Sequence, residues 1–113
     1  MLKKSRRIAK SKDFQELFAQ GQSTRFNGLI IRAVLKKEGP ARFAVVVSKK
    51  VSLKATQRNR IKRLLREALR KYQDAVLPGT GAAIIALPGF NPKSAQETAE
   101  IVRGLFKKAS LLS

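Results

Sequence analysis

Residues 49 to 71 read KKVSLKATQRNRIKRLLREALRK and carry the strongest structural signal in the chain. Apolar residues recur here at intervals of three and four positions, which is the period of a helix with one buried face. These residues are Ile61, Leu64, Leu65, Ala68, Leu69 and Tyr72. The spacing predicts an amphipathic helix from about Thr56 to Tyr72.

The same stretch is strongly basic, with ten Lys or Arg and a single acid, Glu67. Solvent-exposed helices usually mix their charges, because like charges four positions apart destabilise a helix by a few tenths of a kcal/mol. A polyanion would turn that cost into binding energy, and arginine suits phosphate because its planar fork donates two hydrogen bonds at once. We therefore expect nucleic-acid contacts from Lys49, Lys50, Lys54, Arg58, Asn59, Arg60, Lys62, Arg63, Arg66 and Arg70.

The composition describes one small, very basic globular domain. The 113 residues allow a single core, so residues 1–113 are interpreted as one nucleic-acid-binding domain, and a hydrophobic content of 43% excludes a disordered basic tail. The net charge of +18 favours nucleic acid over anionic lipid, because the basic helix lacks the wide aromatic and leucine face of an interfacial helix. Residues 1–10 are basic with little apolar content, and we expect a flexible arm there.

Several function classes are excluded or disfavoured by composition. The chain has no Cys, which excludes disulfides and thiolate metal sites, and no His, the commonest general base. Its seven acids are scattered through different predicted elements, so we expect no catalytic residue and no metal site in the protein itself. No apolar run approaches a membrane span and no signal peptide is evident, so we expect a cytoplasmic protein.

The remaining pattern predicts an α+β fold, a two-layer sandwich of a four-stranded sheet with helices in the order α-β-β-β-α-β-α. Besides the basic helix, the expected elements are a helix at 11–19, a helix after Ser94, and strands at 22–26, 29–35, 42–48 and 82–87. The β-branched strand at 42–48 is typical of the centre of a sheet. Ser94 and Glu97 have the spacing of a capping box.

Phe14 and Phe18 share one face of the first helix, and two interpretations stay open. Such a pair is most often core, but in a protein this basic it can also stack single-stranded bases, at about 1–3 kcal/mol each. Arg25 and Arg32 lie on the neighbouring strands and could flank such a surface. Asn59 is similarly open, because its amide could contact a base edge or a 2′-hydroxyl, or merely fix the local turn.

The chain resembles the protein subunit of bacterial ribonuclease P. The resemblance rests on VSKKVSLKATQRNRIKRLLREALR (residues 47–70), which carries that family's RNR signature at Arg58-Asn59-Arg60. It is supported by KDFQELFAQG (residues 12–21), which matches the family's Phe-x-x-x-Phe segment ahead of a Gly. Size, charge and the order of elements agree over nearly the whole chain.

The resemblance implies a role in an RNA-based enzyme. In this family a large catalytic RNA removes the 5′ leader of precursor tRNA with Mg²⁺ held mainly by the RNA, and the protein assists without being catalytic. By position, the RNR helix and the loop before it would contact the catalytic RNA, while Phe14 and Phe18 would line a cleft for the single-stranded leader. Arg32 stands where relatives often place an aromatic residue. A left-handed β-α-β crossover and a protein that is monomeric without RNA are also expected.

Two other classes compete with this interpretation. A small ribosomal protein that binds rRNA would share the charge and the α+β fold but would not need an aromatic cleft. An autonomous metal-dependent nuclease would need several converging carboxylates, which the scattered acids do not favour.

Overall fold

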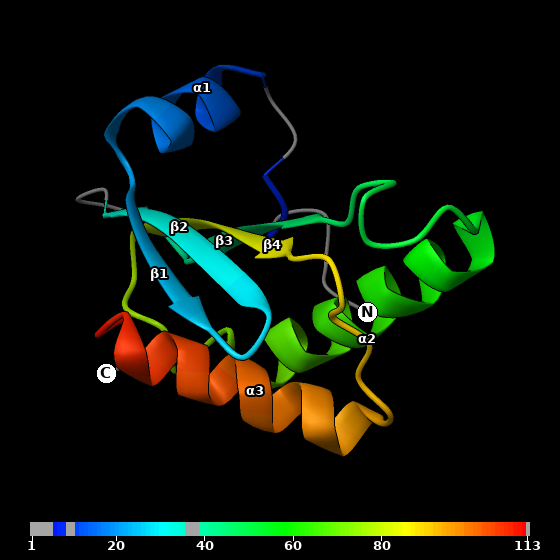
Figure 1. The fold of residues 1–113 in the computed structure, drawn as a ribbon. Helices are drawn as coiled ribbons and strands as arrows, with labels where there is room; N and C mark the ends of the chain where they lie inside the picture. The colour runs from blue at the N-terminus through cyan, green and yellow to red at the C-terminus, as the bar shows by residue number, and fades with distance from the viewer. Residues whose placement is uncertain (1–5, 9–10, 36–38, 113) are drawn as a thin grey trace.

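The computed structural model describes residues 6–8, 11–35 and 39–112 of the chain. Figure 1 shows a single small sheet with helices on both sides, in the predicted order α-β-β-β-α-β-α. The helices are α1 (Ser11–Gln20), α2 (Ala55–Tyr72) and α3 (Ala95–Lys108), and the strands are β1 (Gln22–Phe26), β2 (Leu29–Leu35), β3 (Arg42–Val46) and β4 (Thr80–Ala86). The predicted α+β class with a four-stranded sheet is therefore confirmed.

The strands form one mixed sheet in the order β1-β2-β4-β3. β2 pairs antiparallel with β1 and with β4, whereas β3 and β4 run parallel and are joined through α2. This β3-α2-β4 connection is the crossover for which the resemblance implies a left hand, and that hand stays a prediction. β3 lies at the edge of the sheet, so the predicted central position of this strand is wrong.

The segment before α1 covers the outer edge of β3, which explains why the strand has a sequence typical of a central one. Arg7 forms an isolated parallel bridge with Phe43, and the Ile8 N–H donates a hydrogen bond of 2.8 Å to the Phe43 carbonyl. Arg7 and Ile8 are therefore anchored to β3, whereas the sequence predicts a flexible arm there. The other parts of the predicted arm, residues 1–5 and 9–10, lie outside the described residues.

The two faces of the sheet are covered by different helices. α2 and α3 pack on one face and enclose the main core, which includes Phe43 and Phe106. On the opposite face α1 builds a smaller cluster, in which Leu17 packs with Ala44 and Ala83. Figure 1 shows α1 on one side of the sheet and both longer helices on the other. Among the described residues, α1 is therefore the one helix that covers this side of the sheet.

The start of α3 confirms one half of the predicted capping box. The Ser94 Oγ accepts a hydrogen bond of 3.1 Å from the Glu97 N–H. The Glu97 carboxylate, however, accepts from the Lys93 N–H over 3.0 Å, one residue before the N–H that a capping box would use. Both bonds fix the end of the loop between β4 and α3.

Candidate nucleic-acid interface

The basic residues of α2 lie on the side that the predicted apolar stripe leaves free. Ile61, Leu65, Ala68 and Leu69 are buried, as the spacing predicts. Of the predicted RNA contacts, Lys49, Lys50, Lys54, Asn59, Arg63 and Arg70 are exposed, and Arg58, Arg60, Lys62 and Arg66 are half-buried. Within the described part of the chain, Arg63 has no hydrogen-bond or ion-pair partner. The cations therefore share one helix and the loop before it.

The loop of residues 48–54 has a fixed local shape. The Ser48 Oγ accepts from the Lys50 N–H over 3.3 Å, and the Ser52 Oγ accepts from the Lys54 N–H over 3.2 Å. The loop also holds out Leu53, whose side chain is 86% exposed among the lysines. Sequence reasoning did not single out Leu53, because a lone apolar residue in a basic loop has no periodic pattern.

The positive end of α2 adds to the charge of this loop. The N-cap residue, Lys54, makes no side-chain capping bond, and the first turn of the helix contains no acid. The partial positive charge of the helix N-terminus is therefore not offset by a neighbouring carboxylate of that turn.

The two arginines of the RNR sequence turn toward the protein's own backbone. Arg58 Nη1 donates to the carbonyls of Ser52 and Leu53, over 2.9 and 3.0 Å. Arg60 Nη2 donates to the Pro92 carbonyl, over 2.9 Å, in the loop between β4 and α3. Asn59, which lies between them, is exposed. The sequence places all three residues in one RNA-contact motif. In the structure, the two arginines bind backbone carbonyls of the protein, and Asn59 is exposed to solvent.

The second predicted site lies where α1 meets the sheet, and its two aromatic residues differ. Phe14 is half-buried and packs against the small cluster around Leu17, which is itself only 1% exposed. Phe18 is 50% exposed. The helix face that the sequence treats as one unit therefore has Leu17 as its core residue and Phe18 as its accessible one.

Arg32 joins α1 to the sheet. From β2, its Nε donates to the Leu17 carbonyl over 2.9 Å and its Nη2 to the Phe18 carbonyl over 2.7 Å. Its Nη1 donates to the Ser23 Oγ of β1 over 2.8 Å. The guanidinium carbon also lies 6.0 Å from the centre of the Phe18 ring. Three of its five N–H groups are therefore in use inside the protein. The predicted role of Arg32 at a leader cleft stays a prediction.

A row of side chains crosses all four strands next to α1. The strand register aligns Arg25 with Ile30, Ile30 with Ile85, and Ile85 with Val46. Each residue of this row is two positions along its strand from a residue of a second row, formed by Ser23, Arg32, Ala83 and Ala44. Side chains two positions apart point to the same face of a sheet, so the two rows are neighbours on the face that carries α1. The three aliphatic residues are half-buried and Arg25 is exposed. We call Arg25, Ile30, Ile85 and Val46 the open row.

A small hollow of about 90 Å³ brings the two predicted sites together. Phe14 of the first helix and Arg66 of α2 both line it, with Ile8 and Ala44 between the elements. The edge of β3 therefore separates the aromatic side of the molecule from its basic helix by only a few side chains.

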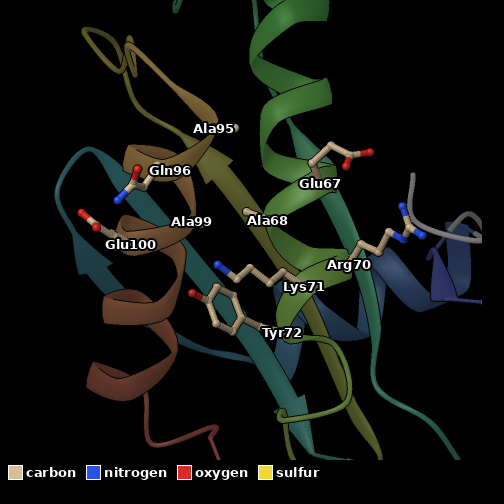
Figure 2. Close-up of a pocket in the computed structure, with 9 residues that line it drawn as sticks. All are labelled: Glu67, Ala68, Arg70, Lys71, Tyr72, Ala95, Gln96, Ala99 and Glu100. Carbon is tan, nitrogen blue, oxygen red and sulfur yellow. The ribbon is translucent and has the colours of Figure 1, made fainter.

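A larger hollow, of about 780 Å³, lies between α2 and α3 (Figure 2). Its lining has both signs of charge, since it includes Lys71 and Arg70 together with Glu67 and Glu100. In Figure 2, Lys71 reaches toward α3 above the Tyr72 ring, whereas Arg70 points away from α3. A groove of mixed charge is not suited to a polyanion, so we leave it outside the interface.

Neither a metal-binding group nor a membrane-spanning helix is found in the described part of the chain. Among the residues that the structure describes, no three His, Cys, Asp or Glu side chains form a group that could hold a metal ion. None of the described helices combines the length and the apolar character needed to cross a bilayer.

The fold and its surface define a small α+β domain of the RNA-binding class. The family model for ribonuclease P matches residues 2–110 of the chain. The ribonuclease P protein component of Exiguobacterium sibiricum is 35% identical over 112 residues, which cover 97% of this chain and 95% of the relative. That of Synechocystis sp. is 39% identical over 88 residues, 77% of this chain and 71% of the relative.

Solved structures agree with these sequence matches. The RNase P protein of Staphylococcus aureus has a TM-score of 0.84 at 26% identity, covering 97% of this chain and 100% of that one. The RNase P protein of Thermotoga maritima has a TM-score of 0.78 at 25% identity, covering 89% and 94%. The chain belongs to the ribonuclease P protein family. It is thus the protein subunit of an RNA-catalysed endoribonuclease of tRNA processing, with ribonuclease P RNA as its partner, and the ribosomal alternative is not favoured.

Proposed function

We propose that the chain binds two RNAs through two surfaces. The catalytic RNA lies against α2 and the loop of residues 48–54, and the single-stranded 5′ leader of precursor tRNA lies on the sheet face beside α1. The proposed binding of the leader rests on Phe18, whose ring is half-exposed at the border of that face. Leu17, its neighbour on the same helix, is buried, so Phe18 is the apolar side chain that α1 presents to a ligand.

The basic surface suits a folded RNA because its cations are numerous and close together. Each phosphate that such a surface neutralises makes binding fall more steeply with salt, with a slope of about 0.7–0.9 per contact. Six contacts would weaken binding on the order of a thousandfold between 50 and 200 mM salt. The protein would thereby lower the electrostatic repulsion between the catalytic RNA and its substrate.

The open row suits a short single strand. It spans four strands spaced about 4.8 Å apart, so its length is roughly 14 Å. Its aliphatic middle, Ile30, Ile85 and Val46, offers apolar contact to base faces, and Phe18 offers a stacking surface. Arg25 stands at one end, and the exposed Lys49 and Lys50 follow β3 at the other. Cations at both ends support binding of the phosphate backbone.

The Mg²⁺ ions of the reaction are assigned in this proposal mainly to the RNA. Mg²⁺ prefers oxygen ligands such as carboxylates, and no three His, Cys, Asp or Glu side chains are grouped among the described residues of the protein. The protein's part would be to bind and orient the substrate, which lengthens the binding site beyond the mature tRNA. We expect the protein to be a monomer without RNA.

The leader surface is tested by reconstituting the protein with the catalytic RNA and measuring tRNA affinity. Phe18→Ala should weaken precursor tRNA binding about 5- to 140-fold, the equivalent of one stacked base, and leave mature tRNA binding unchanged. Leu35→Ala is the matched control, because Leu35 is also an exposed apolar residue, at 64%, but lies outside the open row. Equal losses for precursor and mature tRNA with Phe18→Ala would contradict the leader surface.

The basic surface is tested by salt dependence. Arg63→Ala should reduce the slope of catalytic-RNA affinity against salt by about 0.7–0.9, because one phosphate contact is lost. An unchanged slope would remove Arg63 from the interface.

A further inference from the structure

Both arginines of the RNR sequence are bound to backbone carbonyls, and this separates them from the other cations of α2. Arg58 holds two consecutive carbonyls, those of Ser52 and Leu53, with one nitrogen, Nη1. Arg60, two residues further along α2, donates a hydrogen bond to the Pro92 carbonyl. Both are half-buried, whereas Asn59 and Arg63 are exposed.

The carbonyls belong to the two loops that flank the start of α2. The first is the loop of residues 48–54, with Lys49, Lys50 and Lys54 exposed on it. The second is the loop of residues 87–94, which enters α3. A second bond fastens this second loop, because Gln57 Nε2 donates to the Asn91 Oδ1 over 2.8 Å.

We infer that Arg58 and Arg60 are positioning residues, which brace these two loops so that neighbouring side chains meet the catalytic RNA in a fixed arrangement. This inference rests on the proposed function of the basic surface. Guanidinium suits the task because it is planar and presents several N–H groups in a rigid fork, which a lysine ammonium on a flexible stem does not. A braced loop loses little conformational entropy when it binds, so its lysines bind more tightly than those of a mobile loop.

The position of Leu53 supports this inference. Its carbonyl accepts a hydrogen bond from Arg58 while the residue is 86% exposed, so its backbone is bound to α2 although its side chain is not packed on the core. Leu53 thus marks the side of the loop that faces away from the protein, and the lysines next to it share that loop.

The test separates charge from geometry. Arg58→Lys keeps the charge and removes the fork, so it should weaken binding to the catalytic RNA about tenfold while the salt slope stays that of the unmodified protein. Arg63→Ala is the reference for a lost phosphate contact and should reduce the slope by about 0.7–0.9. Arg103→Lys is the control for the substitution itself, because Arg103 is an exposed arginine of α3 that is not among the predicted RNA contacts.

Hydrogen exchange of the free protein supplies the second readout. Arg58→Lys should speed exchange at the N–H groups of Val51 and Lys54, whose acceptors lie in the braced loop, without changing exchange in the buried part of α2. If Arg58→Lys does not fold, Arg60→Lys takes its place. Its RNA affinity is measured in the same way, and hydrogen exchange is followed at the N–H groups of residues 87–94, the loop that Arg60 binds. If both lysine variants retain full RNA affinity, the inference is overturned. If Arg63→Ala leaves the salt slope unchanged, the result contradicts the proposed RNA contact of the basic surface and not the bracing of the loops.

Discussion

The guanidinium of Arg32 caps the C-terminal end of α1 and lies over the ring of Phe18, 6.0 Å from the ring centre. The last turn of α1 contains no basic residue, so the favourable cation at this negative helix end comes from β2. One side chain therefore fixes how the helix sits on the sheet and where the exposed aromatic ring lies.

Arg32→Ala should destabilise the protein by about 1–2 kcal/mol, because charge-assisted hydrogen bonds to two helix carbonyls and a hydroxyl are lost. The measurement is chemical denaturation of the free protein. Arg25→Ala is the matched control, since Arg25 is exposed on the neighbouring row and should change stability by less than about 0.5 kcal/mol. Similar losses for the two variants would mean that the cap contributes nothing.

Phe14→Ala and Phe18→Ala should separate stability from binding. Phe14 packs against the cluster of Leu17, Ala44 and Ala83, so its truncation should cost about 1–3 kcal/mol of stability. Phe18 is half-exposed, so its truncation should cost less than about 1 kcal/mol even where precursor binding falls. Thermal unfolding of both variants checks this order, and a larger loss for Phe18→Ala would assign it to the core.

Much of the fold follows from local sequence. The apolar run LIIRAVL after the Asn27-Gly28 turn signal predicts β2 to the residue, and the period of 3.6 predicts α2 to within one residue of its start. The edge position of β3 could not be predicted, because it depends on Arg7 and Ile8 covering that edge from a segment whose sequence has no strand pattern.

The sequence predicts the composition of the candidate site but not its geometry. Charge density predicts that α2 faces a polyanion, yet it does not predict that Arg58 binds two backbone carbonyls and Arg60 a third. The open row could not be found either, since Ile30, Ile85 and Val46 become neighbours only through the register of three strands. A one-residue shift would send each side chain to the other face.

Arg6→Ala and Asp74→Ala should differ although the two residues form an ion pair, at 3.2 Å. The Asp74 side chain is 86% exposed, so the pair itself contributes at most about 1 kcal/mol and is screened by salt. Arg6 also donates to the carbonyls of Ala41 and Gln73, over 2.7 and 3.1 Å, and these bonds tie the first segment to β3 and to the end of α2. Arg6→Ala should therefore cost about 1–3 kcal/mol in chemical denaturation at any salt concentration, and Asp74→Ala much less. Equal losses would show that the carboxylate, and not the carbonyls, holds the segment.

Gly104→Ala should destabilise α3, against the usual preference of helices. In an exposed helix interior, Ala is favoured over Gly by about 0.8–1 kcal/mol. At Gly104, however, a Cβ would overlap the ring of Phe26 on β1, which packs against the glycine. The ring must then move, so we expect a loss of about 1–3 kcal/mol. Phe26→Leu provides the control, because in that background the overlap is relieved and Gly104→Ala should be far less harmful. If the glycine substitution is equally costly in both backgrounds, contact with the ring is not the reason for a glycine in this helix.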